Sequence, residues 1–409
     1  AIGLIPFRNN FALDFIENEP ILINTENYSE NEFWELVRNQ YDLHPDFINL
    51  ESGYYNIIPK PTIAKQIDHL KRVNLEGSYY MRTHRFKDKD HITGSLAKFV
   101  GCSSKNLVVT RNATESLDLI ISGFPWESGD EAIYAIQDYG SMQDMFEQIS
   151  KRHRVILRKV SVPNHPKNDK EIVSLYENQI TKRTKLIMIS HMINITGHIL
   201  PVKKICEMAH KYGVQVLVDG AHCVGHIDFK IENLDCDYYG SSLHKWLATP
   251  LGAGLLYVNS KHIPQIWPLI ADHEKDPSKI QRLSHTGTHP VSTDLTILNS
   301  IEYINWIGVK RKEDRLRYLK SYWQKALKDE PNIIINTPFE PMRSCGIGNV
   351  GVKNMKPEIL AERLYKEFNI FTVAIDYANV KGCRITPNVF TNTEELDIFI
   401  RAMKALASN

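Results

Sequence analysis

Short apolar runs alternate with helix-like stretches through the middle of the chain, from about residue 105 to residue 258. The expected strands are residues 106–110, 132–136, 154–160, 185–190, 214–219, 235–239 and 253–258, and the helices expected among them are 113–123, 141–151 and 201–212. Strands that alternate with helices in this way are typical of βαβ units. Most of these runs are apolar and do not alternate strictly with polar residues, as expected of a sheet that helices cover on both faces. We therefore predict an α/β fold with a three-layer α/β/α large domain around a mostly parallel sheet.

The pattern changes beyond about residue 292. Residues 293–327 are predicted to form one long helix, followed by strands at 332–335, 348–352 and near Phe371, and by helices at 357–368 and 394–407. This mixture predicts a smaller α+β domain. The expected organisation is an N-terminal segment, 1–55, that packs with the small domain, a large domain over 56–292 and a small domain over 293–409.

Charge and apolar content exclude several classes of protein. Forty-nine basic residues balance 48 acidic ones, and no long run of one sign occurs. A basic face of the kind that binds nucleic acid or a membrane surface is therefore not expected. No uncharged apolar stretch approaches the ~20 residues that span a bilayer. Six scattered cysteines without a CxxC pair suit reduced thiols. No signal segment precedes Ala1, so a cytoplasmic protein is favoured, and export after removal of such a segment stays open.

A lysine follows one of the expected strands in an unusual setting. Lys245 lies in the motif Ser-Ser-Leu-His-Lys-Trp at 241–246, and Leu-Gly-Ala-Gly follows at 251–254. Burial lowers the pKa of a lysine and makes its amine a nucleophile towards aldehydes. The alternative is a solvated surface lysine, which is the commoner fate of this residue type.

Two further motifs lie at strand ends that should face the same edge of the sheet. Asp219 ends the strand before the motif Asp-Gly-Ala-His, where α/β sheets bind ligands. An acidic group there can keep a pyridinium nitrogen protonated, although it could also only cap the next turn. The stretch Thr-Arg-Asn-Ala-Thr-Glu-Ser at 110–116 opens a helix whose free N–H groups suit a phosphate, although an ordinary helix cap has the same residues.

With these motifs, the chain resembles the class V aminotransferases of the fold-type I pyridoxal-phosphate enzymes, from about Asn49 to Phe399. The likeness is greatest to the isopenicillin N epimerase-like branch, through Gln-Asp-Tyr-Gly-Ser-Met at 137–142, Ile-Ser-His-Met-Ile-Asn-Ile-Thr-Gly-His at 189–198 and Val-Asp-Gly-Ala-His at 218–222. The resemblance implies pyridoxal 5′-phosphate as the cofactor and an amino-acid substrate.

The resemblance also implies roles for individual residues. Lys245 would form the Schiff base with the cofactor, Asp219 would pair with the ring nitrogen, and His222 would lie beside the phenolic oxygen. Further cofactor contacts would come from Asn194 beside the same oxygen, Tyr139 on the ring face, and Ala113, Thr114, Ser242 and His244 at the phosphate. The family also brings a Gly-Thr pair to the phosphate from a neighbouring subunit. Gly287 and Thr288 match that pair, which implies a homodimer with shared active sites.

Substrate-binding residues are predicted in three places. Arg384, in Gly-Cys-Arg-Ile-Thr-Pro at 382–387, matches the family's arginine for the substrate α-carboxylate, and a guanidinium suits that planar partner. An ion pair is the alternative role for it. Gly53 and Tyr54 take the place of a glycine-rich substrate loop. Arg82, in the basic-aromatic cluster at 79–85, could recognise a distal acidic group or belong to an interface.

Two other motifs lead away from this chemistry. Gly-Ile-Gly-Asn-Val-Gly at 346–351 fits the dinucleotide pattern, but no strand precedes it and no helix follows before Pro357, so it is predicted to be a glycine-rich strand. His222 and His226 are four residues apart, but no nearby glutamate completes a zinc motif, and no metal site is predicted.

The reaction type stays open among several possibilities. Epimerase or racemase chemistry at Cα is the first expectation, and aminotransferase and C–S lyase activities are the alternatives. An inactive homologue that only binds the cofactor is the alternative of another class. Cysteine desulfurase activity is not expected, because residues 369–379 hold no cysteine and neither Cys345 nor Cys383 is well placed.

Overall fold

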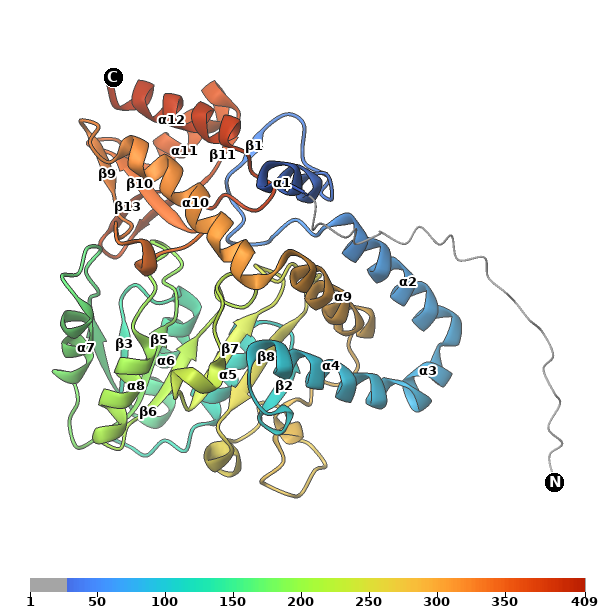
Figure 1. Ribbon diagram of the computed structural model, residues 1–409. Helices are drawn as coiled ribbons and strands as arrows, with labels where there is room; N and C mark the ends of the chain where they lie inside the picture. The colour runs from blue at the N-terminus through green and yellow to red at the C-terminus, as the bar shows by residue number, and fades with distance from the viewer. Residues whose placement is uncertain (1–27, 409) are drawn as a thin grey trace, which may run out of the picture.

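A computed structural model describes residues 28–408 of the chain (Figure 1). Its centre is a seven-stranded sheet in the order β2-β8-β7-β6-β5-β3-β4. The strands are β2 (Leu107–Thr110), β3 (Glu131–Ala135), β4 (Ile156–Val160), β5 (Thr184–Ser190), β6 (Gln215–Asp219), β7 (Tyr238–Ser242) and β8 (Gly254–Val258). The five strands from β7 to β4 are parallel, and β8 runs antiparallel to both of its neighbours. The predicted mostly parallel sheet is confirmed.

Helices cover both faces of this sheet because its central strands are apolar on both sides. In β6, Val216 and Val218 belong to one buried cluster and Leu217 to the other, as expected when successive side chains point to opposite faces. One face packs against α5 (Ala113–Gly123) and α6 (Gly140–His153). The other packs against α4 (Arg85–Val100), α7 (Asp169–Glu177), α8 (Val202–Lys211) and α9 (Val291–Ile307). These are the three predicted layers.

A smaller sheet with its own apolar core forms the second body of the structure (Figure 1). Its order is β12-β13-β10-β9. The strands are β9 (Ile333–Ile335), β10 (Gly348–Val352), β12 (Val373–Tyr377) and β13 (Val380–Ile385), and the helices beside them are α10 (Val309–Leu327), α11 (Pro357–Phe368) and α12 (Thr393–Ser408). The GxGxxG-like segment runs into β10, so it is the glycine-rich strand that the sequence predicts.

The N-terminal segment lies against this smaller body. Strand β1 (Ile48–Asn49) pairs in parallel with β11 (Ile370–Phe371). Arg38, at the end of α1 (Glu30–Arg38), forms an ion pair of 2.8 Å with Glu395. Residues 1–27 of the expected segment, and Asn409 at the end of the expected small domain, lie outside the described residues. The three expected domain boundaries therefore stay predictions.

The long helix predicted over 293–327 is two helices. Helix α9 ends at Ile307 and α10 begins at Val309, because Gly308 has a φ of +88°, a left-handed conformation that glycine adopts without strain. Helix α9 packs against α2 (Lys60–Glu76) and α4. A short α3 (Ser78–Thr83) joins those two helices. Between residues 28 and 408, no helix is long and apolar enough to span a membrane.

Candidate active site

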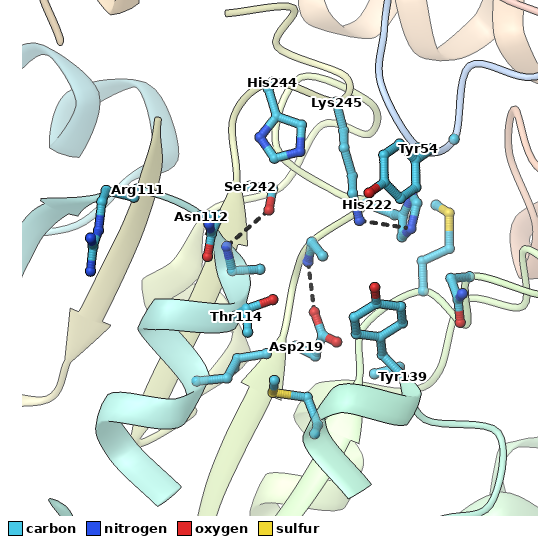
Figure 2. Close-up of a pocket in the computed structure, with 18 of the residues that line it drawn as sticks. Tyr54, Arg111, Asn112, Thr114, Tyr139, Asp219, His222, Ser242, His244 and Lys245 are labelled. Atoms are coloured by element: carbon cyan, nitrogen blue, oxygen red, sulfur yellow. Dashed lines mark hydrogen bonds between the residues drawn. The ribbon is translucent and has the colours of Figure 1, made fainter. Parts of the chain in front are cut away.

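A cavity of about 340 Å³ opens at the carboxyl ends of the central strands (Figure 2). The cavity is lined by the last residues of three strands, Ser190 of β5, Asp219 of β6 and Ser242 of β7, and by the N-terminus of α5. Ligands bind at this edge in open α/β sheets. Twelve of the residues predicted from the sequence line it: Gly53, Tyr54, Ala113, Thr114, Tyr139, Asn194, Asp219, His222, Ser242, His244, Lys245 and Arg384.

Three predicted residues lie outside the cavity of their own chain. Arg82 is an exposed residue of α3, which lies with α2 away from the sheet (Figure 1). Gly287 and Thr288 are exposed in the long connection between β8 and α9, where Gly287 has a φ of +72°. One chain therefore does not bring these three residues to the site, and their predicted roles stay predictions.

Lys245 follows β7 and its amine is buried in the cavity. Burial lowers the pKa of Lys245 to about 8, although the carboxylate of Asp219 acts in the opposite direction. Its Nζ lies 3.2 Å from Nε2 of His222 (Figure 2). A much larger fraction of this amine is therefore unprotonated near neutral pH than for a solvated lysine. That is the state in which an amine attacks an aldehyde.

Asp219 ends β6 with its side chain turned into the cavity. Its Oδ1 accepts a hydrogen bond of 2.9 Å from the N–H of Ala221, so the turn-capping role is also present. Burial raises the pKa of Asp219, while the nearby Lys245 charge lowers it. The carboxylate is thus held at the base of the cavity, where a cationic ring nitrogen would stabilise it.

Hydrogen-bond partners assign the tautomer of His222. The indole Nε1 of Trp246 can only donate, and it lies 3.2 Å from Nδ1 of His222, which must accept. Burial holds the pKa of His222 well below its usual range, so the ring is neutral and its proton lies on Nε2. That N–H points to Lys245, whose unprotonated amine can accept it.

A second histidine, His226, contacts both His222 and Trp246. The N–H of Gly346 donates to its Nε2 at 2.8 Å, so its Nδ1 carries the proton and donates to the carbonyl oxygen of His222 at 2.8 Å. The ring of His226 stacks on Trp246 with 3.7 Å between centroids. Both histidines therefore have protein partners that explain their positions, and neither needs a metal ion to do so.

We expect Trp246→Phe to disturb His222 while leaving the packing on His226 in place. Phenylalanine keeps an aromatic face but removes the donor to Nδ1, so neutral His222 should populate both tautomers. Loss of one such hydrogen bond predicts a fall in activity of roughly 2- to 10-fold. The measurement is ¹⁵N NMR of histidine-labelled protein. An unchanged Nε2–H tautomer of His222 in the variant would show that Trp246 does not set it.

The N-terminus of α5 forms a cradle for an anion. Asn112 caps the helix by accepting a hydrogen bond of 2.9 Å from the N–H of Glu115, and the N–H of Ala113 donates to Ser242 Oγ at 2.9 Å. The positive end of the helix dipole thus faces the cavity beside Thr114 (Figure 2). Nδ1 of His244 is buried there and has no hydrogen-bond partner within residues 28–408. The N–H groups of Ala113 and Glu115 thus have partners within the chain, and His244, in the tautomer with its proton on Nδ1, could donate to a phosphate group placed there.

Arg384 enters the cavity from β13, and the chain's own Glu51 holds it. Nε and Nη2 of Arg384 lie 3.1 and 2.6 Å from the two carboxylate oxygens of Glu51, and Nη1 donates to the carbonyl oxygen of Asn194 at 3.3 Å. Both side chains are buried. The ion-pair alternative is therefore present, but in the interior and not on the surface. Sequence analysis did not identify Glu51 or the role of Trp246.

Comparisons with known proteins agree with this geometry. A family model described as aminotransferase class-V matches residues 59–375. The isopenicillin N epimerase of Streptomyces clavuligerus is 26% identical, over 91% of this chain and 98% of that protein. An apo cysteine desulfurase from Thermococcus onnurineus NA1 superposes with a TM-score of 0.81 at 21% identity, over 91% of this chain and 98% of that one. A mutant of C-DES, with glycine covalently linked to its PLP cofactor, superposes with a TM-score of 0.80 at 18% identity, over 90% and 98%.

Proposed function

The chain belongs to the class V aminotransferase family of pyridoxal-5′-phosphate-dependent enzymes, and on that premise we propose that it acts at Cα of an amino acid or amino-acid-like substrate with epimerase-like chemistry. The observation that carries the proposal is the shared cavity of Lys245 and Asp219: a buried amine with a pKa of about 8 lies beside a buried carboxylate. These two groups suit the aldehyde and the ring nitrogen of the cofactor.

The remaining cavity residues fit the other parts of the cofactor. The α5 cradle suits the phosphate, as does Nδ1 of His244, which has no hydrogen-bond partner in the described part of the chain. His222 and Asn194 would lie beside the phenolic oxygen, and Tyr139, half exposed at the start of α6, would cover a ring face. Gly53, Tyr54 and Arg384 would then meet the substrate.

The bound cofactor supplies an electron sink that makes the proton on the substrate Cα acidic. Asp219 would keep the ring nitrogen protonated, because a buried carboxylate needs a cationic partner. Lys245 Nζ, whose pKa of about 8 lies near neutral pH, can exchange a proton at one face of Cα, and inversion of configuration also requires proton delivery at the opposite face. The N–H on Nε2 of His222 orients that amine.

The cavity also bears on the choice among reactions. No cysteine lines it within the described residues. Burial raises the pKa of both Cys345 and Cys383 to about 12, so neither thiol would be a nucleophile near neutral pH. This supports the expectation that the enzyme is not a cysteine desulfurase. The chain is more identical to the isopenicillin N epimerase of Streptomyces clavuligerus, at 26%, than to a hercynylcysteine sulfoxide lyase matched over a similar length, at 22%, which favours epimerase-like chemistry.

A panel of L- and D-amino acids and thioether conjugates, incubated with the holoenzyme in D₂O, tests the proposal. We expect exchange of the Cα proton for deuterium and inversion of configuration, without release of a keto acid. Keto-acid release would identify an aminotransferase, and a released sulfur product would identify a C–S lyase. A holoenzyme that shows no exchange with any member of the panel would be an inactive homologue.

We further propose that the enzyme is a homodimer. Apolar side chains are exposed along α2 to α4, namely Ile63, Ile67, Leu70, Leu75, Tyr79 and Phe86. Helices α2 and α3 lie at the edge of the structure, where α2 packs against α9 on one side only (Figure 1). Contiguous exposed apolar residues mark association sites, and a second copy is the occupant that would also bring Gly287 and Thr288 to a phosphate.

Charged residues introduced among the exposed apolar side chains of α2 to α4 should therefore separate the subunits. Leu70 and Leu75 are 58% and 70% exposed, so Leu70→Asp combined with Leu75→Asp should leave each chain folded but shift it from dimer to monomer in light scattering. Cofactor retention should fall with it. Ile359→Asp places a charge on an exposed apolar residue of α11 and should leave the dimer intact. A monomeric wild type, or a double variant that stays dimeric, would contradict the assignment.

A further inference from the structure

A carboxylate of the chain itself already neutralises the guanidinium predicted to bind the substrate. Glu51 contacts Arg384 through both carboxylate oxygens, and the two residues are only 8% and 6% exposed. Bidentate, charge-assisted pairs of this kind are among the strongest hydrogen bonds in proteins. Arg384, Gly53 and Tyr54 all line the cavity, so the pair lies at its wall.

The carboxylate is held in place by the loop that carries it. Oε1 of Glu51 accepts hydrogen bonds from the N–H groups of Gly53 and Tyr54, at 3.0 and 2.9 Å. Its backbone is bridged to Thr386, two residues beyond Arg384. The N–H of Thr386 donates to the carbonyl oxygen of Leu50 at 2.8 Å. The loop and the continuation of β13 are thus one unit, and the ion pair is built into it.

Gly53 shows how closely this loop packs on the guanidinium. A Cβ atom at that position would lie 2.9 Å from Cζ of Arg384. Only glycine lets the backbone approach so closely while Glu51 reaches round to the Nε and Nη2 edge. The sequence Glu-Ser-Gly at 51–53 therefore supplies the carboxylate and the space that it needs.

Arg384 keeps unused N–H donors, but its positive charge is already paired with the Glu51 carboxylate. A guanidinium has five N–H groups. Glu51 takes two of them and Asn194 a third. A substrate carboxylate could meet the remaining two, or could displace Glu51, but in either case it would compete with an anion already in place. The opposite effects of the two residues on the pKa of Lys245, lowered by Arg384 and raised by Glu51, agree with this compensation.

We propose that Glu51 is a specificity-determining residue that competes with the substrate carboxylate for Arg384 and thereby weakens the preference of the site for carboxylate-bearing amines. The proposal rests on the proposed function, because it assigns Arg384 to the substrate carboxylate. It implies that the site accepts amines without a carboxylate at Cα more readily than an enzyme whose arginine is unpaired.

The test compares two probes that differ in a carboxylate and need no known substrate. Aminooxyacetate and methoxyamine both bond through nitrogen to the aldehyde carbon of the cofactor and release the amine of Lys245. The ratio of their second-order rate constants, followed by absorbance of the holoenzyme, measures recognition of the carboxylate. Glu51→Gln should raise this ratio about 10-fold or more, since charge-assisted hydrogen bonds of such a pair are worth that much.

Glu131→Gln is the matched control. Glu131 is a fully buried carboxylate paired with Arg158 and Arg183 at the start of β3, outside the cavity, and the ratio should stay at the wild-type value. If Glu51→Gln does not fold by circular dichroism, Glu51→Asp retracts the carboxylate by one methylene and should give a smaller increase. An unchanged or lower ratio in the folded variants would overturn the proposal. A wild-type chain that binds no cofactor would instead refute the proposed function.

Discussion

Lys245→Ala is expected to yield a folded protein that no longer holds the cofactor covalently and whose turnover is at least ~10³-fold lower, because its nucleophile is gone. In the proposed function this amine contributes both the covalent link to the cofactor and the proton-transferring group. No other lysine lines the cavity within the described residues, so none can replace it. Visible absorbance after incubation with pyridoxal phosphate, together with turnover, gives the measurement.

Lys320 provides a matched control for Lys245. It is a buried residue of α10, and burial lowers its pKa to about 8, as for Lys245, but its Nζ is hydrogen-bonded to Gln324 at 2.9 Å. Lys320→Met should therefore keep the visible band. If Lys245→Ala kept the band and Lys320→Met lost it, the cofactor would be linked to a different lysine from the one proposed.

Asp219→Asn is expected to lower turnover by about 10²- to 10³-fold while the cofactor stays bound. A neutral amide does not keep the ring nitrogen protonated, and an unprotonated ring would stabilise the negative charge that develops at Cα less well. The side chain keeps its size, and its carbonyl oxygen can still accept the hydrogen bond from Ala221. The loss should therefore be in kcat with little change in cofactor content, measured as kcat and as bound cofactor per chain.

Asp237→Asn is the control for a buried carboxylate outside the cavity. Asp237 precedes β7 and accepts hydrogen bonds from His210 and His262 at 2.8 Å each. Its replacement should lower stability more than turnover. Equal effects on turnover from the two variants would mean that Asp219 supports the fold and has no special role at the ring.

Local patterns were sufficient to predict most of the strands and the components of the site. Most strands of the large sheet are short apolar runs, although β4 contains Arg158 and Lys159 and β7 ends in two serines. The carboxyl ends of its parallel strands meet at one edge. Asp219, Lys245 and the N-terminus of α5 were therefore expected together from the sequence alone, and they line one cavity. The break at Gly308 was missed because apolar residues continue on both sides of it.

Long-range pairings could not be predicted in the same way. Glu51 and Arg384 are separated by 333 residues, and no periodicity connects a loop near the N-terminus to a strand of the small sheet. The Gly346 N–H that fixes His226 likewise comes from 120 residues away. The only local signal was Gly53. A glycine there indicates that the backbone packs closely against a neighbouring group, but it does not identify that group as the Arg384 side chain. Arg82, Gly287 and Thr288 lie outside the cavity of their own chain, so no local pattern places them at it.

Borohydride reduction of the reconstituted holoenzyme, followed by peptide mapping, is the sharpest test of Lys245 as the residue that holds the cofactor. Reduction converts a carbon–nitrogen double bond between cofactor and lysine into a stable bond that marks the lysine. We predict a single labelled peptide that contains Lys245, with Lys312 and Lys320 unlabelled although both are buried with lowered pKa values. A label on any other lysine, or a chain that stays colourless and unlabelled, would refute this role.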